Sequence, residues 1–164
     1  EPMTSTAASR PRPFAATVLV ATLSLAALPA RAVLGGDVST IAGDQVRMQG
    51  TRHPAAVSSA QVRTHEITLA DGSSIREFVT PGGIVFAVAW NTRFKPDLAA
   101  LLGAHAASYA AAASEAMRAP GIRRHAELRR DDLVVHSTAH LNSYVGKAWL
   151  QSLVPQGVPL DALR

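Results

Sequence analysis

The 164-residue sequence contains no cysteine. This absence excludes structural disulfides, thiolate metal sites and a cysteine nucleophile. It also excludes a lipoprotein, because a lipid anchor would need a cysteine at the cleavage site. Charged residues make up only 17% of the chain and aromatic residues only 5%.

The excess of positive charge is small outside the amino-terminal segment. The formal net charge is +4, with 16 basic and 12 acidic residues. Residues 1–32 hold three of the arginines and one of the glutamates, so 13 basic and 11 acidic residues remain. A nucleic-acid-binding domain is expected to concentrate basic charge on one face. We therefore expect no nucleic-acid partner.

The first 32 residues have the pattern of a signal peptide. Arg10 and Arg12 precede an uncharged apolar run at 14–28, and Ala30-Arg31-Ala32 follows it. A positive segment, an apolar segment of about 15 residues and an Ala-x-Ala site are typical of exported precursors. The run is shorter than the roughly 20 residues that a membrane-spanning helix needs. We expect cleavage after Ala32, a periplasmic or secreted mature protein, and no membrane span after cleavage.

We expect three parts in the chain: the signal peptide 1–32, a loosely structured arm 33–60, and a single α+β domain 61–164. The alternative for 33–60 is a strand with some turns. Patterns rich in β-forming residues, with turns at Asp71-Gly72 and Pro81–Gly83, predict three antiparallel strands within 62–90. Pro96-Asp97 is typical of the start of a helix. The apolar stripe that follows it predicts one long helix to about Met117. Segments 133–137 and 143–150 predict two more strands, with a sixth considered near Glu127. The fold class is then a β-meander sheet of about five strands with one long helix packed across it.

Several short motifs together resemble one known family. They are spread over the whole mature chain and comprise His65-Glu66, Asp71-Gly72, Arg76–Val79, Pro81, Gly83, Val85–Trp90, Pro96–Leu98, Leu101–Gly103, Asp132–Val135 and Ala139-His140. The chain resembles an exported proteobacterial family known only as domain of unknown function 2844. The resemblance implies a Gram-negative source and a periplasmic or secreted location, and it implies no activity. His105 departs from the pattern, because an aromatic residue is expected there.

The six histidines are the first side chains to consider for a site. His136 and His140 would lie about 13 Å apart along a strand at 3.3 Å per residue, too far to share one metal ion. His65 and Glu66 are neighbours, so a strand would direct them to opposite faces. We treat His65, His136, His140 and Trp90 as candidates for any site. We predict no catalytic residue, no cofactor and no metal site.

The sequence favours a non-catalytic interaction or accessory module, with an unknown protein partner in the cell envelope. Its exposed sheet edges could add a strand from that partner. Two alternatives stay open: an envelope hydrolase that uses histidine and carboxylate side chains, and a histidine-based metal carrier. A concave pocket that gathers His65 or His140 with a carboxylate would favour the hydrolase, and converging histidine nitrogens would favour the carrier.

Overall fold

A computed structural model describes residues 34–118 and 125–163 of the chain. The expected signal peptide and its cleavage site after Ala32 lie outside the described residues. The described residues form one sheet, in which every pair of neighbouring strands is antiparallel. The strands are β1 (Thr51–Ser59), β2 (Val62–Thr68), β3 (Ser74–Val79), β4 (Val85–Thr92), β5 (His125–Arg130), β6 (Leu133–His140) and β7 (Ser143–Leu150).

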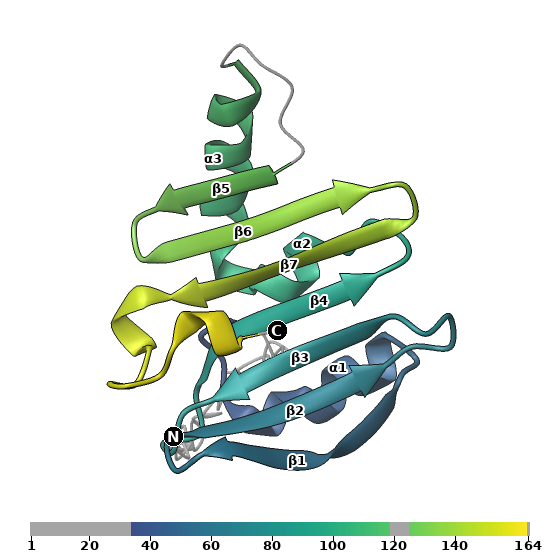
Figure 1. Ribbon diagram of the computed structural model, residues 1–164, viewed down its shortest axis with the longest axis vertical. Coiled ribbons are helices and arrows are strands. Elements are labelled where there is room, and N and C mark those ends of the chain that lie inside the picture. Colours follow the sequence, from purple (N-terminus) through teal and green to yellow (C-terminus); the bar gives the residue numbers. More distant parts are fainter. Residues whose placement is uncertain (1–33, 119–124, 164) are drawn as a thin grey trace, which may run out of the picture.

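The order of strands in the sheet is β1-β2-β3-β4-β7-β6-β5 (Figure 1). The first four strands form a meander. The chain then leaves the sheet through α2 (Leu98–Leu102) and α3 (Ala106–Arg118) and returns at the opposite edge with β5. Because β6 and β7 run back towards the middle, β7 pairs with β4, and Lys147 lies opposite Ala89. Residues from both halves of the chain therefore meet at the centre of the sheet.

The two predicted turns of the meander are present. The carboxylate of Asp71 accepts hydrogen bonds from the backbone N–H and the hydroxyl of Ser73, both at 2.9 Å. Gly72 has a φ of 81° and Gly83 a φ of 86°, in the left-handed region that glycine adopts without strain. These turns set the register that brings β2, β3 and β4 together.

The α+β class is confirmed, but the sheet has seven strands rather than about five. The additional strands are the two edges, β1 and β5, of which β5 is the sixth strand considered near Glu127. Edge strands carry polar residues on their exposed sides, so neither has the apolar alternation by which strands are recognised. The segment 33–60, expected to be loosely structured, contains helix α1 (Ile41–Arg47) as well as β1.

The single long helix expected from 97 to 117 was also wrong, because it is two helices. Asp97 begins the first as expected, and its carboxylate accepts a hydrogen bond from the backbone N–H of Ala100 at 3.0 Å. The break falls at Gly103, whose φ is 48°. A residue in that conformation ends an α-helix, and a 3₁₀ turn, Gly103–His105, connects α2 to α3.

Within the described residues, helices α1, α2 and α3 lie on one face of the sheet, and the carboxyl-terminal tail after β7 lies on the other (Figure 1). We call these the helix face and the open face. The helix-face core includes Ile41, Val88, Trp90, Leu102 and Val135. A smaller core on the open face is made by Phe78, Phe86, Val134 and Trp149, and the tail contributes Leu163, which is buried there. The tail covers part of the open face and leaves the rest accessible.

Candidate functional site

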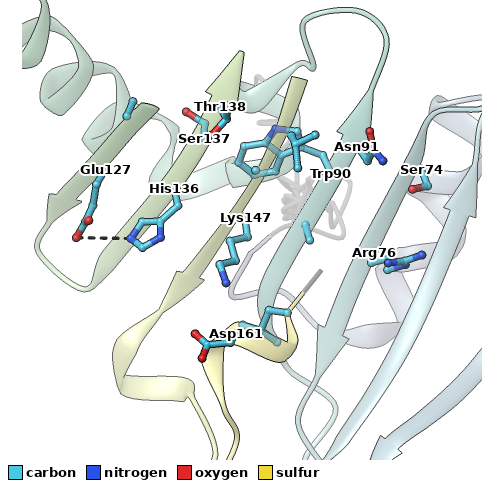
Figure 2. A pocket seen from close by; sticks show the side chains of 15 residues that line it. Ser74, Arg76, Trp90, Asn91, Glu127, His136, Ser137, Thr138, Lys147 and Asp161 are labelled. Carbon is cyan, nitrogen blue, oxygen red and sulfur yellow. Dashed lines mark ion pairs between the residues drawn. The ribbon is translucent and has the colours of Figure 1, made fainter. Parts of the chain in front are cut away.

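The accessible part of the open face is a cleft of about 830 Å³. It lies over β3, β4, β7, β6 and β5, and the tail contributes Asp161 and Leu163 to its wall (Figure 2). Residues with hydrogen-bonding side chains that line it are Ser74, Arg76, Asn91, Glu127, His136, Ser137, Thr138, Lys147 and Asp161. We call this the open-face cleft.

One row of cross-strand neighbours crosses the floor of this cleft. It runs from β2 to β5 through residues that lie directly opposite one another: Glu66, Arg76, Ala89, Lys147, His136 and Glu127. Directly opposite residues on neighbouring antiparallel strands share a face of the sheet. The row therefore has carboxylates at its two ends and basic or titratable groups at its centre, around the small side chain of Ala89.

Each basic or titratable group of the row has a local contact that orients it. Arg76 pairs with Glu66, with an Nη2–Oε1 distance of 3.1 Å. The Lys147 ammonium donates to the backbone oxygen of Leu160 in the tail at 2.7 Å. The Nε2 atom of His136 lies 3.5 Å from Oε1 of Glu127, the pair joined by a dashed line in Figure 2. Positive charge is thus held in place across the centre of the cleft.

Trp149 packs beside the same centre, on the open face of the sheet. Its indole contacts the His136 ring edge-on, with 4.8 Å between ring centroids, and the Lys147 ammonium lies 5.9 Å from the centroid of the indole. The indole is only 2% exposed. A buried aromatic ring beside an ammonium group adds cation–π attraction. This packing restricts the positions that His136 and Lys147 can adopt.

A second polar cluster lies on the helix face, beneath α1. His65 on β2 is the direct cross-strand neighbour of Glu77 on β3, and Asp44 of α1 interacts with Glu77 through its side chain. Glu77, Asp44 and His65 are 0%, 1% and 5% exposed. Arg47 forms an ion pair with Asp44, and the guanidinium of Arg52 donates to Nδ1 of His65 at 3.1 Å.

Burial decides the charges in this cluster. Burial, and then the neighbouring Asp44 carboxylate, raises the pKa of Glu77 to about 8. Burial, and then the positive charge of Arg52, lowers the pKa of His65. Because an arginine can only donate, Nδ1 of the neutral His65 ring accepts and its proton is on Nε2. At neutral pH this cluster contains a mostly protonated Glu77 and a neutral His65.

The cluster beneath α1 does not open to a ligand. The pocket next to it, of about 300 Å³, is lined by Arg47 and Met48 of this region but not by Asp44, His65 or Glu77. The Nε2 atom of His65 and both carboxyl oxygens of Glu77 are buried and lack a well-formed hydrogen bond. These groups therefore affect the stability of the fold rather than a bound molecule.

Of the four residues considered from the sequence, His136 and Trp90 both border the open-face cleft, whereas His65 and His140 lie elsewhere. His136 lines the open-face cleft, and His65 is in the buried cluster on the other face. His140 is exposed at the end of β6. Trp90 is 3% exposed in the helix-face core, and it also borders the floor of the cleft. The structure therefore does not bring these four together.

The sequence analysis did not select Glu77, Arg76 or Lys147 as candidate site residues, and of these three only Glu77 had a visible signal. Ile75 and Val79 predict the buried face of β3, so strict alternation also directs Glu77 into the core. Lys147 and Arg76 had no such signal. Their proximity depends on the pairing of β4 with β7, which joins distant parts of the chain.

A hydrolase and a metal carrier would each need a particular set of side chains close together. His136 and Glu127 form a histidine–carboxylate pair in the cleft, and Ser137 also borders the cleft. Alternation along β6 directs the side chains of His136 and Ser137 to opposite sides of the strand, so the two are not aligned as a nucleophile and its base. Among residues 34–118 and 125–163, no three histidine, aspartate or glutamate side chains are placed to hold a metal ion. In that same part of the chain, no helix is long and apolar enough to cross a membrane.

The fold and the cleft define an α+β protein with a seven-stranded antiparallel sheet, helices on one face and a charged cleft on the other. The chain belongs to the family described as protein of unknown function (DUF2844), whose model matches residues 30–163. The resemblance found in the sequence is thereby confirmed. No curated protein and no solved structure matches the chain.

Proposed function

We propose that the protein is an exported, non-catalytic interaction module that binds an acidic segment of a partner protein in the open-face cleft. The observation that carries this proposal is the row Arg76–Ala89–Lys147–His136 across the cleft floor. Two permanent cations stand on either side of an alanine, and the alanine leaves room above it for a carboxylate. Arginine and lysine are the side chains that recognise carboxylates most strongly.

The contacts of the row support a binding role. The Arg76 side chain is 38% exposed, so a ligand can reach it. The His136 side chain is also 38% exposed, although its Nε2 atom is buried. Their present partners, Glu66 and Glu127, lie at the outer ends of the row. Ion pairs of exposed groups contribute little free energy. An incoming carboxylate can therefore share or replace these contacts at small cost.

The export part of the proposal rests on the amino-terminal pattern, with Ala30-Arg31-Ala32 after the apolar run. Mass spectrometry of the protein from a periplasmic fraction should find Val33 as the first residue. An intact amino terminus in a membrane fraction would contradict export by a cleaved signal.

The binding part is tested by titration with two synthetic peptides, one rich in aspartate and glutamate and one with the matching amides. We expect the acidic peptide to shift the NMR signals of β3, β7 and β6, and the amide peptide to leave them unchanged. Arg76→Gln and Lys147→Gln should each weaken binding by about tenfold, as expected for the loss of one charge-assisted hydrogen bond.

Arg118→Gln is the matched control, because Arg118 is exposed on α3 and does not line the cleft. It should bind the acidic peptide like the wild type. Equal affinity for both peptides, or equal loss in all three variants, would show that the cleft does not select negative charge.

A further inference from the structure

The two edges of the sheet differ in how well they are protected against pairing. The β1 edge contains Pro54, which has no backbone N–H, and its register with β2 is interrupted twice. Proline and bulges are the features by which edge strands avoid pairing with other chains. The β5 edge contains no proline, and its register with β6 is regular over all six residue pairs. Of the two edges, β5 therefore has the more regular backbone for pairing with another strand.

The charges on β5 show what kind of strand fits there. Glu127 and Arg129 lie on the open face, where their side chains are 53% and 58% exposed. They are two positions apart, with Leu128 between them on the helix face. Within the strand they pair with each other, with an Nε–Oε1 distance of 2.7 Å. A second strand with the same sequence, running antiparallel, offers opposite charges at both positions.

We propose that two copies of this chain associate through their β5 strands, antiparallel and centred on Leu128, to form one continuous sheet. In this register Glu127 lies opposite the partner's Arg129, and Arg129 lies opposite the partner's Glu127. A two-fold axis at Glu127 would place the two Glu127 carboxylates opposite each other. An axis at Arg129 would place the two Arg129 guanidinium groups opposite each other. Opposite charges directly across a strand pair stabilise it and like charges destabilise it. The charge pattern therefore selects one register.

The helix face of the edge is suited to the same arrangement. α3 crosses behind β5 and continues past the edge of the sheet (Figure 1). Ala126 and Leu128 line a groove of about 730 Å³ together with the alanine-rich side of α3. Met117, near the projecting end of the helix, is 81% exposed. A two-fold axis at Leu128 places both α3 helices on the same face of the joined sheet, where small alanine side chains allow helices to approach closely.

Charge exchange at β5 tests this proposal, with mass measured by light scattering after gel filtration of the protein purified from expression of the full-length chain. The wild type should elute as a dimer. Glu127→Arg and Arg129→Glu should each weaken the dimer by at least about tenfold, because two symmetric contacts become repulsive. An equimolar mixture of the two variants should dimerise again, since each supplies the charges that the other lacks.

The double variant E127R/R129E should also dimerise like the wild type. Arg63→Glu is the control for a change of charge as such, because Arg63 is exposed on β2 and lies far from β5 in the strand order. Circular dichroism checks that each variant is folded. A monomeric wild type, single variants that stay dimeric, or a mixture that stays monomeric would each overturn the proposal.

Discussion

The two faces of this sheet contain titratable groups in opposite situations. On the helix face Glu77, Asp44 and His65 are buried beneath α1. On the open face Arg76, Lys147 and His136 border a cleft of about 830 Å³. Titratable groups therefore have different consequences on the two faces. Beneath the helix they change the stability of the fold with pH, whereas in the cleft they are available to a ligand.

The part of the open face beneath the tail is a buried core like that of the helix face, so we expect substitutions there to destabilise the fold. Phe86 is fully buried there and contacts Phe78, with 6.4 Å between ring centroids. We expect Phe86→Ala to lower the free energy of unfolding by about 3–5 kcal/mol, as is usual when a core aromatic side chain is removed. Urea denaturation followed by tryptophan fluorescence measures it. A loss below about 1 kcal/mol would mean that the tail does not enclose a core.

The buried cluster should make stability depend on pH. The pKa of Glu77 is raised from 4.5 to about 8, so the folded state holds its proton more tightly than the unfolded state. Stability is then greatest below pH 4.5 as far as this group is concerned, and it falls as the pH rises to about 8. His65, with a lowered pKa, has the opposite effect, since its contribution is lost as the pH falls below 6.5.

Between pH 7.5 and 9, where His65 is almost entirely neutral in both states, the effect of Glu77 can be measured nearly alone. We expect the free energy of unfolding to fall by about 1 kcal/mol over this interval. Glu77→Gln should remove most of this fall, because the amide cannot ionise. Glu66→Gln on the open face is the matched control and should keep it. An unchanged pH profile in Glu77→Gln would place the titrating group elsewhere.

Local patterns predicted those parts of the fold that depend on neighbouring residues. The meander at 62–90 follows from alternating strands and from turns whose glycines accept positive φ, and the start of α2 follows from Asp97. The edge strands were considered, within 33–60 and near Glu127, but were not counted in the predicted sheet, because β1 and β5 lack a regular apolar alternation. The long helix was predicted as continuous because its apolar spacing runs through Gly103, although this residue breaks it.

The cleft could not be predicted, for a different reason. It exists because β7 pairs with β4 and not with a neighbour in sequence, and because the tail folds back over the open face. Both depend on contacts between distant segments. Histidine is common at active sites, and the histidines were therefore the first candidates for a site. Of these candidates, only His136 lines the cleft. The residues beside it, Arg76 and Lys147, have ordinary positions in the sequence.

The smallest change in the free energy of unfolding is expected for a substitution in the cleft. Arg76→Gln removes an ion pair with Glu66 in which both side chains are about one-third exposed. Exposed pairs of this kind contribute about 0.2–1 kcal/mol, so the free energy of unfolding should change by less than about 1 kcal/mol. Thermal unfolding of the variant beside Phe86→Ala measures the difference directly. A loss as large as that of Phe86→Ala would show that Arg76 is needed for folding, and its loss of acidic-peptide binding would then not be evidence for the cleft.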